Sequence, residues 1–209
     1  MKIALIGASG KVGSKILNEA LNRGHDVTAV IHTHDLALDH PKLTKKKGDL
    51  LDPDGLSEVL AGHDAVVASN NPGLEKELAA SKSMLKAVKK SGVKRFILVG
   101  GAGTMDATPG TFLIDTPAFP EQFRPYALPM RDLYLILKEE SGLDWTFLGP
   151  AVVFVEDGER TGKYRAQEEV ILQGPDGGPS QISYADFAVA MVDELENPKH
   201  IRKRFTISY

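Results

Sequence analysis

The sequence contains no cysteine among its 209 residues. Without a thiol the chain has no disulfide framework, no thiolate ligand for zinc or an iron–sulfur cluster, and no cysteine nucleophile. A reducing compartment is compatible with this composition. Thiol chemistry is therefore removed from the functions to consider.

Two further features are missing: an excess of basic residues and a long apolar run. The 25 Lys and Arg are outnumbered by 28 Asp and Glu, giving a net charge of -3, so DNA or RNA is not an expected partner. The N-terminus has only a four-residue apolar run, Ile3–Ile6, before Gly7. That run is too short for a signal peptide or a membrane span, and we expect a cytoplasmic protein with no membrane partner.

What the chain has is a regular alternation of buried-strand and helix patterns. Its length fits one domain, and its 42% apolar residues suffice for a full core. Apolar runs typical of buried parallel strands occur at Ile3–Ile6, Val27–Ile31, Ala65–Ala68, Phe96–Val99 and Trp145–Leu148. Amphipathic helices are expected at Val12–Leu21, Pro53–Leu60, Leu74–Lys90, Tyr126–Glu140 and Tyr184–Leu195, with a last strand near Arg204–Ser208.

This alternation predicts an α/β fold: a Rossmann-type doubly wound parallel sheet formed by residues 1–209 as one domain. Residues from about 151 to 183 are expected to form a small cap that contributes to a substrate site. The Pro- and Gly-rich stretch Gly100–Pro129 interrupts the periodicity, and its Phe residues favour an ordered loop.

A glycine-rich loop directly follows the first predicted strand. In GASGKVG, Gly7, Gly10 and Gly13 are spaced G-x-x-G-x-x-G and lead into a helix. Such a loop allows a tight turn, a close approach of a pyrophosphate to the backbone, and contact with a helix N-terminus. The pattern indicates dinucleotide binding; the alternative is a tight turn that only packs helix on strand. The spacing excludes a Walker A loop.

The residues after the second strand indicate which dinucleotide is preferred. An acid at that position would bind the ribose hydroxyls of NAD and repel a 2′-phosphate, but none occurs before Asp35. NADP(H) is therefore favoured, NAD(H) remains possible, and Lys11, His32 and Thr33 are candidate phosphate ligands. The alternative is that these are ordinary exposed residues. No metal site is expected, because His32 and His34 have no third ligand.

Several segments together resemble a known family. They are GASGKVG, KGDLLDP (Lys47–Pro53), DAVVASNNPG (Asp64–Gly73), RFILVGGAGT (Arg95–Thr104), GLDWTFLGP (Gly142–Pro150), GERTGKY (Gly158–Tyr164) and ISYADFAVAMVDELENP. The chain resembles atypical short-chain dehydrogenases/reductases, and among them the NAD(P)H-flavin reductase-like group, related to NmrA-like proteins and biliverdin reductase B. The resemblance runs from Met1 to Tyr209.

The resemblance implies a set of cofactor-binding residues. His32 and Thr33 would lie at the adenosine ribose, Asp49 and Leu50 at adenine, Ser69 and Asn70 along the central ribose and phosphates, and Gly100 and Gly101 near the nicotinamide. The glycine loop would contribute Gly7, Ser9, Gly10, Lys11, Val12 and Gly13. Alternatives remain: Asp49 as a cap of the next helix, and Ser69 and Asn70 as strand-end turn residues.

The sequence departs from the wider family at the positions of its Ser-Tyr-Lys triad. The Ser position is occupied by Gly100-Gly101-Ala102, and Tyr126 is followed by Met130 where Lys is expected. A literal Tyr-x-x-x-Lys, Tyr134 to Lys138, lies in a packing run and is interpreted as a core Tyr and a solvated Lys, with a catalytic role as the alternative. We therefore expect the triad to be absent.

A substrate site is expected between the Gly100–Pro129 loop and the cap near Phe154–Tyr164. Tyr126 and Thr104 are the catalytic candidates. Tyr164, Phe154 and Phe112 are the substrate-site candidates, with Phe119 and Phe123 as further members of an apolar wall. For each of these residues, the alternative is ordinary packing or a satisfied hydroxyl.

These features predict an NADPH-preferring oxidoreductase that transfers hydride to a flavin, a quinone or a similar planar acceptor. Such acceptors need alignment more than a protonating triad, and a flavin is expected as a substrate rather than a bound prosthetic group. Two alternatives remain open: a non-catalytic NmrA-like redox sensor, and a sugar-nucleotide epimerase or carbonyl reductase using Tyr126 or Tyr134. The oligomeric state is left open between monomer and homodimer.

Overall fold

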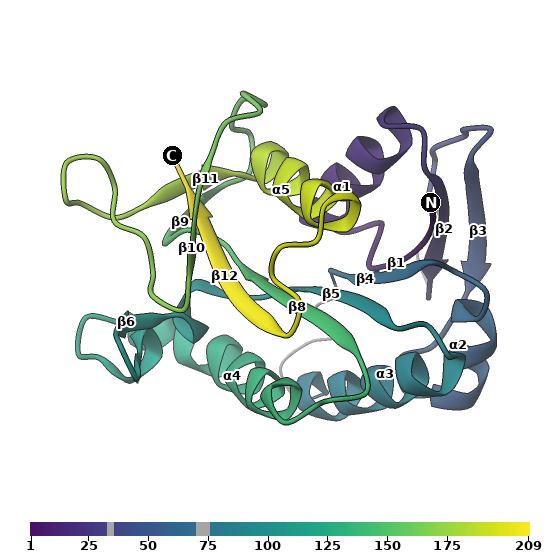
Figure 1. Cartoon of the computed structure of the whole chain (residues 1–209), viewed down its shortest axis with the longest axis horizontal. Helices are drawn as coiled ribbons and strands as arrows, with labels where there is room; N and C mark the ends of the chain where they lie inside the picture. Colours follow the sequence, from purple (N-terminus) through teal and green to yellow (C-terminus); the bar gives the residue numbers. More distant parts are fainter. Residues whose placement is uncertain (33–35, 70–75) are drawn as a thin grey trace.

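The computed structural model describes residues 1–32, 36–69 and 76–209. Its centre is an eight-stranded sheet with the order β10-β12-β8-β5-β4-β1-β2-β3 (Figure 1). The strands pair in parallel, except that β10 pairs antiparallel with β12 at one edge. The strands are β1 (Lys2–Ile6), β2 (Asp26–Ile31), β3 (Leu43–Lys47), β4 (Ala65–Ala68), β5 (Arg95–Val99), β8 (Asp144–Gly149), β10 (Arg165–Glu168) and β12 (Lys203–Ser208).

Helices cover both faces of this sheet. Helices α1 (Lys11–Asn22) and α5 (Tyr184–Glu196) lie on one face, and α2 (Pro53–Leu60), α3 (Glu77–Ser91) and α4 (Arg124–Lys138) lie on the other (Figure 1). Strand β1 shows why: Ile3 and Leu5 join the core under α1 and α5, and the intervening Ala4 and Ile6 join the core under the other three helices. The predicted Rossmann-type doubly wound fold is confirmed.

Local signals in the sequence set the limits of several helices. The side chain of Asp52 accepts a hydrogen bond from the Gly55 amide at 3.1 Å, and Pro53 follows as the first residue of α2. Gly92, with φ +80°, ends α3 in the left-handed conformation. Helix α4 begins before the predicted residue 126 and contains Pro129, so the irregular stretch ends earlier than the proline pattern indicates.

The apolar runs do not reveal strand β3. Its sequence is LTKKK, and its side chains are exposed or half-buried. It pairs with β2 at the outer edge of the sheet, where lysines discourage pairing with another chain. An edge strand buries too little surface to need the continuous apolar run of a central strand.

Residues 100–123 form an ordered connection, as predicted. They contain three short 3₁₀ turns and the strand pair β6 (Asp106–Thr108) and β7 (Thr111–Phe112). The guanidinium of Arg204, on β12, donates to the Thr104 carbonyl and the Asp106 carboxylate and lies over the Phe112 ring. This buried arginine thereby anchors the connection to the main sheet.

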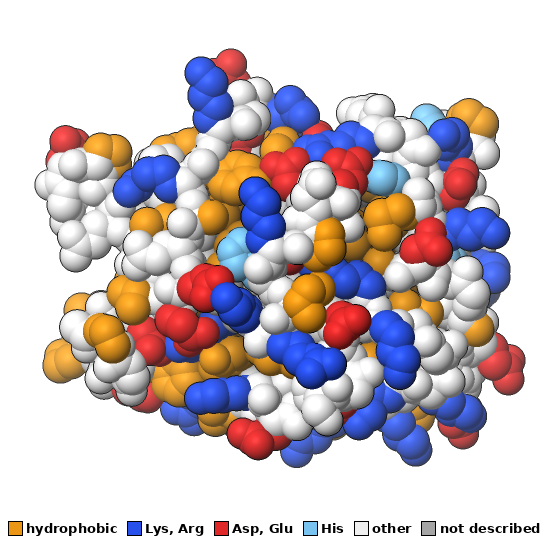
Figure 2. Space-filling model, viewed as in Figure 1, with side chains coloured by type: hydrophobic (Ala, Val, Ile, Leu, Met, Phe, Trp, Pro, Cys, Tyr) orange, Lys and Arg blue, Asp and Glu red, His pale blue; other side chains and the backbone are white. Residues whose placement is uncertain are grey.

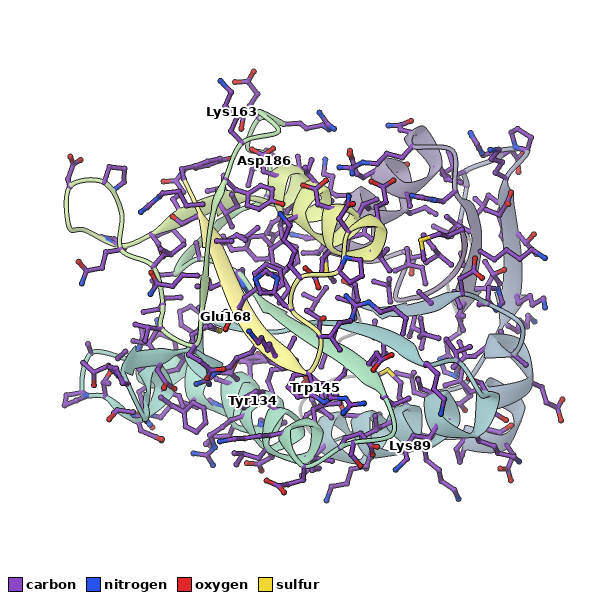
Figure 3. All side chains as sticks on the ribbon, viewed as in Figure 1. Lys89, Tyr134, Trp145, Lys163, Glu168 and Asp186 are labelled. Atoms are coloured by element: carbon purple, nitrogen blue, oxygen red, sulfur yellow. The ribbon has the colours of Figure 1, made fainter. Side chains whose placement is uncertain are left out.

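The segment expected to form a cap, residues 151–183, is divided between two places. Strand β10 extends the main sheet, whereas β9 (Val153–Val155) and β11 (Gln181–Ser183) form a separate parallel pair. Between β9 and β10, a loop is held by the buried carboxylate of Asp186, which accepts from the Thr161 hydroxyl and the Gly162 amide, both at 2.7 Å. Figure 3 shows Asp186 directly beneath the loop that carries Lys163.

Candidate cofactor-binding cleft

The glycine loop between β1 and α1 has a backbone shape that requires its first and third glycines. Gly7 has φ +82°, a left-handed conformation that L side chains rarely adopt. The Gly10 amide donates to the Gly7 carbonyl at 3.0 Å, which closes the turn. A Cβ on Gly13 would lie 2.0 Å from the Gly7 carbonyl oxygen. The loop and the first turn of α1 therefore pack backbone against backbone.

The same turn leaves the N-terminus of α1 available to an anion. Gly10 is the N-cap residue, and no side chain caps the helix. The first amides of a helix have no partner within the helix, and the helix dipole favours negative charge there. The geometry thus fits a pyrophosphate, as the spacing of the glycines predicts.

A cleft of about 890 Å³ opens beside this N-terminus. Its walls come from the carboxyl-terminal ends of β1 to β5 and from the starts of α1, α3 and α4, which is where open α/β sheets bind ligands. Its volume lies in the upper part of the usual range for ligand sites. The predicted residues that line it are Gly7, Ser9, Gly10, Lys11, Val12, His32, Asp49, Leu50, Ser69, Gly100 and Tyr126.

Four of the predicted cofactor residues are not among those lining the cleft. Gly13 lies behind the loop, against Gly7, and Gly101 accepts a hydrogen bond from the Thr104 amide at 3.0 Å. Thr33 and Asn70 lie outside the residues that the structure describes. Their assignments stay predictions.

One end of the cleft carries the residues expected at the adenosine. His32 Nε2 and Asp49 Oδ2 are 3.7 Å apart, and both side chains are largely exposed. Asp49 also accepts a hydrogen bond from the Leu51 amide at 2.8 Å. The helix that follows is capped by Asp52 instead, so the alternative role of Asp49 as its cap is wrong.

Lys11 lies at the rim of the cleft and is already paired. Its Nζ atom is 2.6 Å from Oε2 of Glu156, which follows β9. The hydrogen bond to Glu156 raises the pKa of Lys11, so the side chain is a cation. A bound phosphate at Lys11 would compete with this carboxylate.

The structure does not bring four of the predicted substrate and catalytic residues to the cleft. Thr104 is fully buried, and its hydroxyl donates to the Gly101 carbonyl at 2.6 Å. Phe112 packs edge-on against Tyr134, and Phe154 packs between Tyr184 and Phe187. The Tyr164 hydroxyl donates to Asp193 at 2.6 Å, beside a separate cavity of about 420 Å³. The predicted placement of these four residues at a substrate site is wrong. The two phenylalanines pack against other rings, and the two hydroxyl groups are hydrogen-bonded within the protein.

The two tyrosines considered for catalysis have opposite environments. Tyr134 is 4% exposed and makes edge contacts with Trp145 and Phe147, as Figure 3 shows for Trp145. Burial raises the pKa of Tyr134, which opposes a role in proton transfer. Tyr126 is 50% exposed and lines the cleft together with Met130, four residues later.

Sequence reasoning missed two titratable residues that line the cleft, Lys76 and Glu77. Glu77, the first residue of α3, is only 5% exposed. Burial raises the pKa of its carboxyl group. One signal could have found it: Met84 and Ser81 are buried, and Glu77 lies seven and four residues before them on the same stripe of the helix.

Three further features of the described residues concern surface charge, membrane-spanning helices and metal ligands. Acidic and basic side chains are interspersed on the face shown in Figure 2. Among the described residues, none of the helices is both long enough and apolar enough to cross a membrane. Within those same ranges, no cluster of His, Asp and Glu is arranged to hold a metal ion.

Comparison with known proteins identifies the family. The model of a family described as NAD(P)H-binding matches residues 7–198. The protein "Uncharacterized protein YwnB" of Bacillus subtilis (strain 168) is 38% identical over 216 aligned residues, covering 99% of this chain and 98% of that protein.

Two solved structures are similar over all of this chain. A "putative epimerase" from Bacteroides thetaiotaomicron is 43% identical, with a TM-score of 0.93, over 100% of this chain and 96% of that one. A "putative NADH-flavin reductase" from Streptococcus pneumoniae TIGR4 is 37% identical, with a TM-score of 0.87, over 100% of this chain and 99% of that one. The chain belongs to the NAD(P)H-binding family of atypical short-chain dehydrogenases/reductases.

Proposed function

We propose that this protein is an NADPH-preferring oxidoreductase that transfers hydride to a planar acceptor such as a flavin or a quinone. The observation that carries the proposal is the composition of the cleft. The uncapped N-terminus of α1 lies in one part of the cleft, and Gly100, Tyr126 and Met130 line another part. At the positions of the triad, the chain has neither the Ser nor the Lys that would assist a tyrosine in protonating a carbonyl substrate. The acceptor binds as a substrate and leaves after reduction.

The residues of the cleft fit a dinucleotide with an additional phosphate. The first amides of α1 and the backbone of Gly10 would hold the pyrophosphate. A Cβ on Gly10 would lie 3.3 Å from the Gly7 carbonyl oxygen, so the loop is tight at this position. Lys11 and His32 are the cationic candidates for the 2′-phosphate. The preference is modest, because Lys11 is shared with Glu156 and His is a weaker cation than Arg.

The acceptor end offers a flat backbone beside apolar side chains. A Cβ on Gly100 would lie 2.0 Å from the Phe147 ring, so the position must stay free of a side chain. Val99 and Met130 contribute apolar surface next to it. When bound, the nicotinamide supplies the hydride; the chain aligns the two rings and excludes water from between them.

The relatives' names divide between two classes of reaction. The name of the Streptococcus pneumoniae protein agrees with a reductase, whereas that of the Bacteroides thetaiotaomicron protein suggests proton transfer at carbon or at a carbon-bound oxygen. Tyr126 would have to do that work without a lysine one turn later, since Met130 occupies the position. This arrangement favours the reductase.

The direct test is consumption of NADPH and of NADH by the purified protein with FMN, riboflavin and a panel of small quinones. We expect saturable turnover that prefers NADPH. The Gly10→Asp variant should lose it, because a carboxylate placed at the helix N-terminus repels the pyrophosphate. Enzyme-free reactions control for direct chemical reduction.

Tight NADPH binding without turnover of any acceptor would contradict the proposal. That result would favour the redox sensor, for which a difference in affinity between oxidised and reduced dinucleotide is the next measurement.

A further inference from the structure

One carboxyl group in the cleft differs from every other buried acid that the structure describes. Five acidic residues are buried: Glu19, Glu77, Asp106, Asp186 and Glu194. Four of them have strong partners. Glu77 has no hydrogen bond or ion pair within residues 1–32, 36–69 and 76–209, although its side chain is 5% exposed and lines the cleft.

The four partnered acids show how this protein usually stabilises a buried carboxylate. Glu19 accepts from Arg23 at 2.8 Å and from Arg160 at 2.8 and 2.9 Å. Glu194 accepts from Arg95 at 3.0 Å and lies 2.8 Å from the His200 ring. A buried carboxylate without such partners is strongly disfavoured relative to its neutral form. Among these five acids, Glu77 is the one whose pKa is raised, and burial is the cause.

The charged groups near α3 do not change this conclusion. From α2, Asp54 is bound to Lys90 at the far end of α3, 2.7 Å apart. From α4, Arg131 pairs with Asp115 and Asp132, both at 3.3 Å. Lys76, next to Glu77, is exposed. Burial alone accounts for the raised pKa of Glu77.

Among the other titratable groups that line the cleft, Lys76 is the exposed neighbour of Glu77. Lys11, His32 and Asp49 belong to other parts of the cleft. Lys11 is bound to Glu156, and His32 lies opposite Asp49. Glu77 is on α3, which follows β4, and Gly100 follows β5, the neighbouring strand of the sheet. Both line the cleft with Tyr126, so Glu77 lines the same cleft as the residues expected at the acceptor.

We propose that Glu77 is a catalytic residue of this cleft, the acid that protonates the acceptor after hydride transfer. The proposal rests on the reductase function proposed above and specifies its proton source. It also specifies the acceptor as one that becomes an anion on receiving a hydride, as a flavin or a quinone does.

The acceptor receives a hydride, with its two electrons, from the reduced dinucleotide, which is oxidised. The O–H bond of Glu77 breaks, and its proton bonds to the anionic nitrogen or oxygen of the reduced acceptor. The carboxylate of Glu77 then takes a proton from water. Its burial without a partner favours that return to the neutral form.

The test compares wild type, Glu77→Gln and the control Glu139→Gln, whose glutamate is exposed at the end of α4. Glutamine keeps the shape of the side chain and its ability to donate a hydrogen bond, but it has no acidic proton. With NADPH and either FMN or menadione, we expect kcat of Glu77→Gln to fall by roughly 100-fold. The Kd for NADPH should stay close to that of wild type, and Glu139→Gln should match wild type in both.

Two readouts separate a proton donor from a structural residue. In wild type, kcat should fall as pH rises through the raised pKa of Glu77, because the acid must be protonated; Glu77→Gln should lack this fall. In the protein without cofactor, unfolding should show that Glu77→Gln is stabilised relative to wild type at high pH and not at low pH. A stability difference that does not change with pH would overturn the proposal.

The failure of this proposal is distinguishable from failure of the proposed function. Wild type that reduces no acceptor contradicts both. Wild-type turnover that is retained by Glu77→Gln, with the same pH profile, contradicts only the role of Glu77. A variant that loses NADPH affinity and keeps the pH profile makes Glu77 a cofactor ligand and also overturns the proposal.

Discussion

At the scale of single residues, the three glycines of the N-terminal loop have different tasks. Gly7 supplies a positive φ, Gly10 supplies a bare N-cap, and Gly13 allows α1 to touch the loop. Gly10 therefore serves ligand binding, and Gly13 serves folding. A side chain at Gly10 would obstruct an anion, whereas a side chain at Gly13 would meet the carbonyl of Gly7 and would disturb the fold itself.

Gly13→Ala should destabilise the protein by about 1–3 kcal/mol. The added methyl would lie 2.0 Å from a backbone oxygen that cannot move without opening the turn, and this clash outweighs the better helix propensity of alanine. Chemical denaturation measures the change. Gly178→Ala is the matched control, since a Cβ there meets nothing within 4 Å. Equal stability of the two variants would refute the packing argument.

Tyr126→Phe and Tyr134→Phe test whether a phenol takes part in the reaction. For a hydride acceptor that needs no tyrosine, each variant should keep kcat/KM within about tenfold of wild type, a barrier change below about 1.4 kcal/mol. Steady-state kinetics with NADPH and the best acceptor give the answer. A larger loss at unchanged NADPH affinity would support carbonyl or epimerase chemistry instead.

The residues of the cofactor loop could be predicted because their signal is local: three glycines within seven positions, between a strand and a helix. Glu77 has no such motif. Its burial depends on α3 packing against the sheet, and only its position on the buried stripe of that helix marks it. Thr104 and Phe112 illustrate the reverse case. They lie in an irregular connection whose side chains turn inward: the Thr104 hydroxyl donates to the Gly101 carbonyl, and the Phe112 ring contacts Arg204 and Tyr134. Sequence pattern carries no information about that direction.

At the scale of elements, two buried charged groups hold the irregular parts of the chain to the sheet. Arg204, on β12, anchors the connection after β5, where Asp106 is its buried partner. Asp186, at the start of α5, anchors the loop between β9 and β10. Both groups are buried, so their anchoring bears on stability.

Arg204→Met should destabilise the protein by about 3–5 kcal/mol, because it leaves the buried Asp106 carboxylate without its cation. Adding Asp106→Asn to that variant removes the stranded charge and should recover part of the loss. Denaturant unfolding of both single variants and the double variant measures the coupling. Strictly additive losses would show that the pair does not interact.

Asp186→Asn should remove stability that depends on pH. Burial raises the pKa of Asp186, but hydrogen bonds from Thr161, Tyr209 and the Gly162 amide outweigh burial and lower it overall. A lowered pKa stabilises the folded state above the pKa of the unfolded chain and stops doing so as pH falls through the folded value.

We therefore expect the Asp186→Asn variant to be less stable than wild type at neutral pH by about 1.5–3 kcal/mol. The difference should shrink below a pH of about 4. Unfolding free energies measured across this range test it, and a difference that grows toward acid would contradict the assignment.

Helices and strands can be predicted from sequence where buried apolar residues give them a recognisable pattern. The central strands contain buried apolar runs, and each predicted run lies within an observed strand. Strand β10 has only exposed side chains, and it exists because it pairs with β12 at the edge of the sheet. That pairing joins distant segments, so the placement of Tyr164 and Phe154 at a substrate site could not be corrected without the structure.

At the scale of the whole molecule, the doubly wound sheet explains why the functional residues gather in one place. Parallel strands β1 to β5 end at the same edge, and the loops that follow them form the cleft from the glycine loop to Gly100. The residues that line the cleft come from positions 6 to 130 of the sequence. One continuous surface is therefore available to a dinucleotide and to the proposed acceptor.

The measurement that tests this account most directly is an anaerobic single turnover. The protein, loaded with one equivalent of NADPH, is mixed with FMN or menadione, and both absorbances are followed. The account predicts that NADPH is lost and the acceptor is reduced mole for mole, and that Gly10→Asp, which does not hold NADPH, shows neither change. NADPH that stays bound and unoxidised in the presence of every acceptor would contradict it.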